Sequence, residues 1–159
     1  MMLKNLNSEV EENLRIQGLD SSLKILNKWV TQRFTAIFLP DNDPVEIVRL
    51  VDKLNDASTA PLSPVPFANS FCKLVLRDGS VLTSNSVVDK RFDGKYPQGT
   101  VISDVGLQLV QQGCKFYGNL CHADYKENKI DEDEFVFLQS IAGAFPRYLL
   151  FGNSSLPCV

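Results

Sequence analysis

Long apolar runs and clusters of positive charge are both missing from this sequence of 159 residues. No stretch approaches the roughly 20 apolar residues that a membrane-spanning helix requires. Residues 1–10 alternate Leu with Lys, Asn and Glu, without the continuous apolar core of a signal peptide. The formal net charge of −3 includes no run of Lys and Arg, which argues against sequence-independent nucleic-acid binding. We therefore expect a cytoplasmic protein without membrane or nucleic-acid partners.

Residues suited to nucleophilic or metal chemistry are also scarce. There is one histidine, His122, and the cysteines at 72, 114, 121 and 158 form no CxxC pair. In a reducing compartment, such thiols are expected to be free and to pack as small apolar residues. Cys121 and His122 should point to opposite faces of a strand, which argues against a shared catalytic or metal site unless a bulge re-aims one of them. We favour a packed strand histidine, with pocket-lining and catalytic or metal-binding roles as alternatives.

Phosphate-binding and calcium-binding patterns are absent as well. The sequence contains neither GxxxxGK[ST] nor GxGxxG. The acidic run Asp131–Glu134 lacks the alternating ligands and central glycine of a calcium loop. Negative charge at this position suits the start of a helix. No metal site is expected.

Apolar periodicity predicts helices near both ends of the chain. Leu3, Leu6, Val10 and Leu14 recur at helical spacing, and a second helix follows Gly18 with Leu23, Leu26 and Val30 on its apolar face. A final helix should begin near Asp131, carry an apolar stripe that ends at Phe145, and end or kink at Pro146.

The middle of the chain reads as strands and loops. Strands are expected at 34–39, 80–88, 101–110 and 115–124, the last two joined by a hairpin turn in which Gly113 supplies a positive φ. Residues 45–54 fit a helix by local pattern, although their Val and Ile content also fits a strand. Residues 56–70 form a Pro-rich loop, 71–76 a short apolar stretch, and 89–99 a polar turn region. Antiparallel strands covered by terminal helices indicate an α+β domain.

Five segments, in chain order, resemble those of bacterial GAF domains. LNKWVTQRFTAIFL (residues 26–39) resembles the first helix and strand of that family. The tetrapeptide Asn69–Cys72 resembles its SFC signature, and residues 88–92 resemble its DxRF-type turn. SDVGLQL (residues 103–109) and YGNLCHAD (residues 117–124) resemble its last two strands. The resemblance covers roughly residues 20–150.

The resemblance implies a GAF-like fold with a central antiparallel sheet of five or six strands. Terminal helices would cover one face, while loops and short helices would cover a small-molecule pocket on the other. It also implies that residues 45–54 form the second strand, against their helical pattern. The implied domains are a helical extension (1–19), the GAF domain (20–151) and a flexible tail (152–159). The candidate pocket residues are Phe71, Cys72, Arg91, Phe92, Gln108, Asn119 and His122.

A sensory or regulatory domain is the function that this resemblance implies. It would bind an unidentified small molecule and act through a separate effector protein or a homodimer. Some relatives are free-methionine sulfoxide reductases, but the cysteines here do not match that subfamily's segments. Others attach a bilin near a Cys-His pair, whereas Cys121-His122 lies inside the final strand, so no bilin is expected. A ligand-free structural dimerisation adaptor is a further alternative.

The family pattern is broken at three positions. Asp104 and Gln108 stand where aromatic residues and Pro are common, and Asn119 stands where Thr or a small residue is usual. If these side chains line the cavity, its ligand differs from those of well-known relatives.

A homodimer through the terminal helices is the last expectation. The stripe of Leu3, Leu6, Val10 and Leu14 would stay exposed on a monomer. So would a second stripe at the other end, made of Phe145, Leu149, Leu150 and Phe151. Exposed apolar patches usually mark an interface, which a two-fold dimer can bury. The alternative is that residues 3–16 fold back on their own domain.

Overall fold

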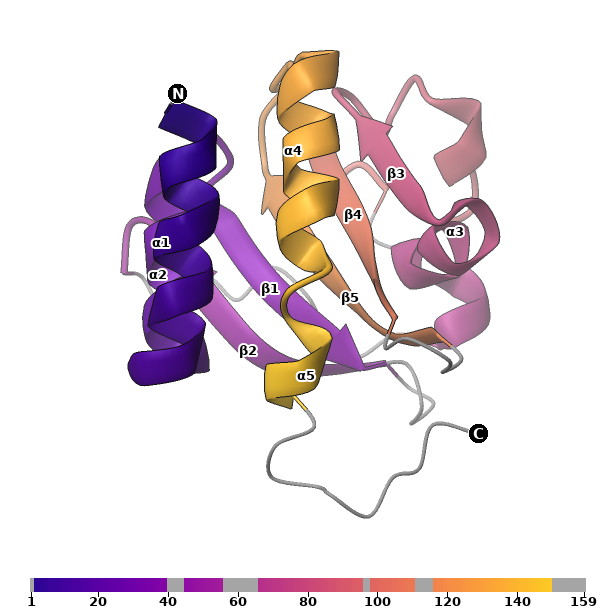
Figure 1. The fold of residues 1–159 in the computed structure, drawn as a ribbon. Coiled ribbons are helices and arrows are strands. Elements are labelled where there is room, and N and C mark those ends of the chain that lie inside the picture. The colour runs from indigo at the N-terminus through magenta and orange to yellow at the C-terminus, as the bar shows by residue number, and fades with distance from the viewer. Residues whose placement is uncertain (1, 40–44, 56–65, 96–97, 111–115, 150–159) are drawn as a thin grey trace.

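One antiparallel sheet organises the molecule. The computed structural model describes residues 2–39, 45–55, 66–95, 98–110 and 116–149. The strand order in this part of the chain is β2-β1-β5-β4-β3 (Figure 1). The strands are β1 (Phe34–Leu39), β2 (Glu46–Asp52), β3 (Ser80–Thr83), β4 (Ser103–Val110) and β5 (Phe116–Asp124). The helices are α1 (Met2–Ile16), α2 (Leu19–Trp29), α3 (Phe71–Asp78), α4 (Glu132–Ala142) and α5 (Pro146–Leu149), with short 3-10 turns η2 (Phe67–Asn69) and η3 (Lys90–Phe92).

Helices from both ends of the chain cover one face of the sheet, which we call the helical face. Figure 1 shows α1, α2 and α4 on this face. Their apolar stripes pack with alternate residues of the strands, including Ile37, Val105, Leu107 and Leu120, in one core cluster. Helix α4 starts as the acidic run predicts, because the Asp131 side chain accepts a hydrogen bond from the amide of Glu134 at 2.8 Å.

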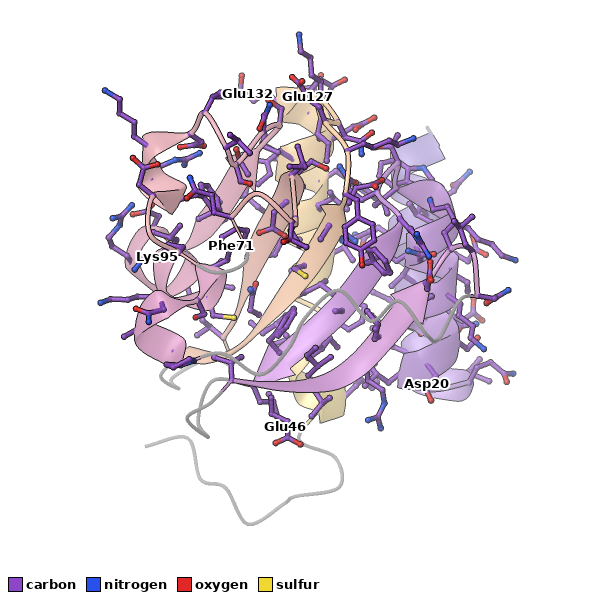
Figure 2. The ribbon with its side chains drawn as sticks, turned by 180° about the vertical axis from the view of Figure 1, so that it is seen from behind. Asp20, Glu46, Phe71, Lys95, Glu127 and Glu132 are labelled. Carbon is purple, nitrogen blue, oxygen red and sulfur yellow. The ribbon has the colours of Figure 1, made fainter. Side chains whose placement is uncertain are left out.

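Shorter elements cover the opposite face, which we call the second face. Helix α3 packs on β3, β4 and β5 there, and Phe92 of η3 joins the same core cluster. Figure 2 views the molecule from this side, with Phe71 and Lys95 in front of the sheet. The expected layered α+β architecture is therefore confirmed.

Several expectations about individual elements need comment. Residues 46–52 form a strand, as the resemblance implied, because pairing with β1 outweighs the local helical pattern. Strand β3 ends at Thr83 instead of 88, and α4 ends at Ala142, so Pro146 begins α5 and does not terminate α4. Proline suits a first helical position because its missing N–H would have no intrahelical partner. The expected turn at Gly113 lies outside the described residues.

The apolar stripe of α1 is not exposed, which corrects the premise of the dimer prediction. Leu6, Val10 and Leu14 are buried in the core of their own domain, as is Phe145. Helix α1 packs along α2 and also contacts α4. Gly18, with φ of +96°, allows the reversal between α1 and α2. Residues 3–16 therefore follow the fold-back alternative. Within the described residues, no helix combines the length and apolar character needed to cross a membrane.

Candidate functional site

Polar side chains gather on the second face where β4 and β5 pair beneath α3. Asp104 lies opposite Ala123, and Gly106 lies opposite Cys121. Because paired residues in antiparallel strands share a face, Asp104 lies on the same side as Cys121 and Ala123, which belong to the second-face core. Alternation along β5 adds Asn119 to this side. Cys72 reaches the same region from the first turn of α3.

Gly106 allows α3 to approach the sheet closely. A Cβ atom at this position would lie 2.4 Å from Cγ2 of Val75, well inside van der Waals contact. The same position would be 3.6 Å from Oδ1 of Asn119 and 3.8 Å from Oδ2 of Asp104. A glycine inside a strand often marks such a close approach. Gly106 thus lies among α3, the amide and the carboxylate.

The Asn119 side chain connects the strand backbone to α3. Its Oδ1 accepts a hydrogen bond from the amide of Leu107 at 3.1 Å, and its Nδ2 donates to Sγ of Cys72 at 3.5 Å. Both side chains are buried. A buried amide that makes these bonds holds the thiol in a fixed place.

Asp104 has no such partners. It is 3% exposed, and its carboxylate accepts no hydrogen bond from any described residue, although its oxygens are not among the fully sealed polar atoms. Burial raises the pKa of this carboxyl to about 7. The other buried aspartate, Asp124, accepts hydrogen bonds from the Arg33 amide and from Asn128, each at 3.1 Å. An acceptor left open on one buried aspartate and not on the other suggests a binding group.

The two described thiols are poor nucleophiles in this arrangement. Burial raises the pKa of Cys72 to about 11 and raises that of Cys121 well above its ordinary value, and the nearby Asp104 adds to both increases. A reactive cysteine needs a lowered pKa and a positive environment. Within the described residues, no three His, Cys, Asp or Glu side chains converge as metal ligands.

Aromatic rings border this region on its outer side. The rings of Phe71 and Phe92 pack edge to face, with centroids 4.5 Å apart. Arg91, although adjacent in sequence, is partly exposed and held elsewhere. Its guanidinium bonds to the carboxylate of Asp89 at 2.7 Å and to the carbonyl of Leu82 at 2.8 Å. Arg91 is therefore a surface ion-pair residue that stabilises the turn before η3.

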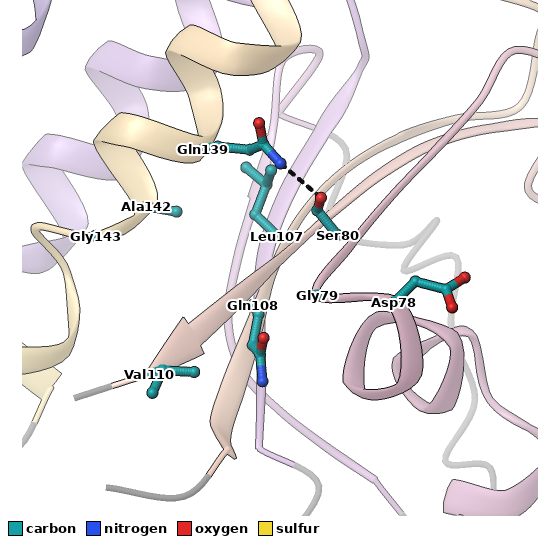
Figure 3. Close-up of a pocket in the computed structure, with 9 residues that line it drawn as sticks. All are labelled: Asp78, Gly79, Ser80, Leu107, Gln108, Val110, Gln139, Ala142 and Gly143. Carbon is teal, nitrogen blue, oxygen red and sulfur yellow. Dashed lines mark hydrogen bonds between the residues drawn. The ribbon is translucent and has the colours of Figure 1, made fainter. Parts of the chain in front are cut away.

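Gln108 lines a separate groove at the edge of the sheet, with a volume of about 390 Å³ (Figure 3). The groove lies between the end of β4, the start of β3 and the last turn of α4. Ser80 and Gln139 meet across it in a 2.6 Å hydrogen bond. Its lining is Asp78, Gly79, Ser80, Leu107, Gln108, Val110, Gln139, Ala142 and Gly143.

His122 lies on the helical face, away from the thiols. Its Nδ1 is 2.9 Å from the hydroxyl of Thr35, to which Asn27 of α2 donates at 3.0 Å. The ring is fully buried, and burial lowers its pKa to about 3. The expected separation of Cys121 and His122 is confirmed, and a packed, neutral histidine fits this environment.

The seven predicted site residues thus divide by location. Phe71, Cys72, Phe92 and Asn119 come together in and beside α3. Gln108 pairs with Asn119 on the same face, close to Gly79 at the end of α3. Arg91 and His122 lie elsewhere. The sequence prediction omitted Asp104 from the site. The signal was the single carboxylate inside the expected strand SDVGLQL. A charged residue at an inward strand position usually needs a partner.

Solved structures with the same fold are GAF domains and related enzymes. The GAF domain of an Acinetobacter phosphoenolpyruvate-protein phosphotransferase has a TM-score of 0.75 at 15% identity, over 99% of this chain and 98% of that chain. The corresponding GAF domain from Coxiella burnetii has a TM-score of 0.73 at 11% identity, over 97% of each chain. A free methionine-R-sulfoxide reductase from Neisseria meningitidis, solved with its substrate, has a TM-score of 0.75 at 14% identity, over 97% and 92%.

These similarities establish the fold. No protein-family model matches the sequence, and no curated protein is significantly similar to it. The chain therefore has the GAF fold, which is shared by domains of phosphotransferases and by sulfoxide reductases.

Proposed function

We propose that this GAF-fold chain is a sensory or regulatory domain that binds a small molecule on its second face. The observation that carries the proposal is the open carboxylate of Asp104, buried beside Asn119 and Cys72 beneath α3. Ligand sites are typically apolar with a few convergent polar groups. The effect of the ligand would reach a separate effector protein, or a second copy of the chain, through changes in the elements that cover this face.

Native mass spectrometry of protein purified from cells tests the proposal directly, because it detects a retained small molecule. A thermal-shift screen complements it, since a ligand that binds the native state raises the melting temperature by mass action. The panel comprises nucleotides, cyclic nucleotides, amino acids, amines, 2-oxo acids and haem-type compounds. We expect at least one hit. A protein that retains nothing and responds to nothing would instead favour the ligand-free structural adaptor.

A thiol-dependent reductase is the second candidate, favoured by the sulfoxide reductases that share the fold. Such a reaction takes two electrons from thiols and converts the sulfoxide to a sulfide and water, leaving a disulfide for a thioredoxin to reduce. The raised pKa values of Cys72 and Cys121 weigh against it. We expect no thioredoxin-coupled reduction of free methionine-R-sulfoxide. Turnover that is lost in Cys72→Ser or Cys121→Ser would establish the enzyme.

The homodimer stays a prediction, without the interface first expected for it. Leu6, Val10 and Leu14 are occupied within their own domain, so this stripe offers no apolar surface to a second copy. Sedimentation velocity at tens of micromolar protein measures the oligomeric state. If a dimer forms, the double variant Leu6→Asp with Val10→Asp cannot test its interface, because both substitutions would disrupt the core.

A further inference from the structure

We propose that Asp104 makes the second-face site selective for small molecules that carry a cationic nitrogen, such as a primary amine or an amidine. This inference rests on the proposed function and specifies its ligand class. Both oxygens of the Asp104 carboxylate are without a hydrogen-bond donor among the described residues, and neither is sealed away. A cationic N–H group supplies the two things that this buried group lacks, a donor and a counter-charge.

The described side chains around Asp104 supply no positive charge. Strand β5 contributes Cys121 and Ala123, α3 contributes Cys72, and β3 places Thr83 opposite Asp104. The Thr83 hydroxyl bonds to Asp89. The only titratable groups among these neighbours are the two thiols, which are neutral at pH 7 because their pKa values are raised.

Cations on the elements that cover the second face have other partners or are exposed. The Arg77 guanidinium forms an ion pair with Asp78 at 2.8 Å, and Arg91 forms one with Asp89. Lys95 donates to the carbonyl of Ala68 at 2.9 Å. The side chains of Lys73 and Lys90 are exposed. Within the described residues, no cationic side chain is therefore available to offset the charge of Asp104.

The same arrangement disfavours anionic ligands at this point. A phosphate or carboxylate placed beside Asp104 would meet a like charge in surroundings of low dielectric, with no described cation to offset it. Ionisation of Asp104 also couples binding to pH. Its pKa of about 7 means that a cation bound near pH 6 displaces a proton from the carboxyl, so affinity should rise as the pH increases through 7.

Paired probes of equal shape test the inference. Benzylamine and benzamidine carry the cation, whereas benzyl alcohol and benzamide are their neutral counterparts. Binding is measured by titration calorimetry at pH 6 and pH 8 for the wild type, Asp104→Asn and Asp20→Asn. The Asp104→Asn substitution keeps the side-chain shape and removes the charge. The Asp20→Asn control removes an exposed carboxylate from α2, on the other face of the sheet.

We expect the wild type and Asp20→Asn to bind the cationic probes at least ten-fold more tightly than the neutral ones. This preference should be lost in Asp104→Asn. At pH 6 the binding heat of the wild type should depend on the ionisation heat of the buffer, because a proton is released. Equal affinity for charged and neutral probes, unchanged preference in Asp104→Asn, or no binding of either cationic probe at 10 mM would each overturn the inference.

The two proposals fail separately. A non-cationic molecule retained in native mass spectrometry, together with a negative probe series, would overturn the ligand class and leave small-molecule sensing intact. Failure of the whole ligand panel as well as the probe series would overturn both.

Discussion

The hydroxyl of Thr35 lies 2.9 Å from Nδ1 of His122 across the pairing of β1 and β5. Asn27 donates to the same hydroxyl from α2, so a chain of three buried polar side chains joins the helix to the centre of the sheet. The fully buried imidazole stays neutral because burial lowers its pKa to about 3. This contact therefore has a defined dependence on pH.

Replacement of His122 should change the acid limb of the stability profile. The folded pKa of about 3 lies below the ordinary histidine pKa of 6.5, so the unfolded state binds a proton first as the pH falls. The contribution of His122 to the free energy of unfolding is fully present above pH 6.5. It decreases as the pH falls toward 3, by up to about 1.4 kcal/mol per pH unit. The variant His122→Gln should lose this slope, although its overall stability will be lower. Urea unfolding at several pH values measures the slope, and an unchanged acid limb would contradict the assignment.

Replacement of Asp104 should have the opposite effect. Its folded pKa of about 7 lies above the ordinary aspartate pKa of 3.8, so the native state binds more protons between these two pH values. The contribution of Asp104 to the free energy of unfolding is fully present below pH 3.8. It decreases as the pH rises to 7, again by up to about 1.4 kcal/mol per pH unit. Asp104→Asn should therefore be more stable than the wild type at pH 8, by roughly 1–3 kcal/mol after allowance for a buried amide, with little gain at pH 4.

The contributions of His122 and Asp104 change in opposite directions between pH 4 and 6.5. The free energy of unfolding of the wild type should therefore vary little with pH in that interval. The variants His122→Gln and Asp104→Asn should then have slopes of opposite sign. Parallel profiles for the two variants would show that both groups titrate at their ordinary pKa values.

A methyl group at residue 106 should push α3 away from the sheet. Gly106→Ala places its Cβ 2.4 Å from Val75, and overpacking of this kind costs about 1–3 kcal/mol. The double variant with Val75→Ala should recover part of the loss, giving a favourable coupling energy in a double-mutant cycle. Gly143→Ala is the matched control, because its nearest neighbour is at 3.4 Å and its φ of −62° suits alanine. Equal losses at both glycines would contradict the close packing.

The stripe of α1 should contribute to the stability of a single domain. Leu14→Ala should lower the free energy of unfolding by about 2–5 kcal/mol, as expected for a buried leucine, without changing the sedimentation coefficient. Glu12→Ala, an exposed change in the same helix, should have little effect. Dissociation of a dimer by Leu14→Ala at unchanged domain stability would restore the interface that the sequence suggested.

Patterns along the sequence predicted the fold well because they report local constraints. The alternation in residues 103–124 and the acidic run at Asp131 correspond to β4, β5 and α4. The resemblance supplied β2, whose local pattern favoured a helix. The sequence could not indicate which layer covers an apolar stripe, so the α1 stripe was expected to be exposed.

The candidate site was harder to predict because it depends on contacts between distant segments. Only the packed structure shows that Arg91 is held by Asp89, that His122 faces α2, and that no described residue donates to the Asp104 carboxylate. Phe71, Cys72, Phe92 and Asn119 lie close together in the structure, and all four belong to the quoted motifs; that they bind a ligand stays a prediction.

The pleat of β5 has a chemical consequence. Because alternate side chains of β5 point to opposite faces, the imidazole of His122 lies on one side of the sheet. The thiol of Cys72 and the carboxyl of Asp104 lie on the other side. Deleting one residue after Asn119 would reverse the facing of the rest of the strand. The histidine would then lie near Cys72 and Asp104, a combination that resembles the nucleophile, base and acid of hydrolytic enzymes. The register of this strand thus determines whether the imidazole meets the thiol and the carboxyl.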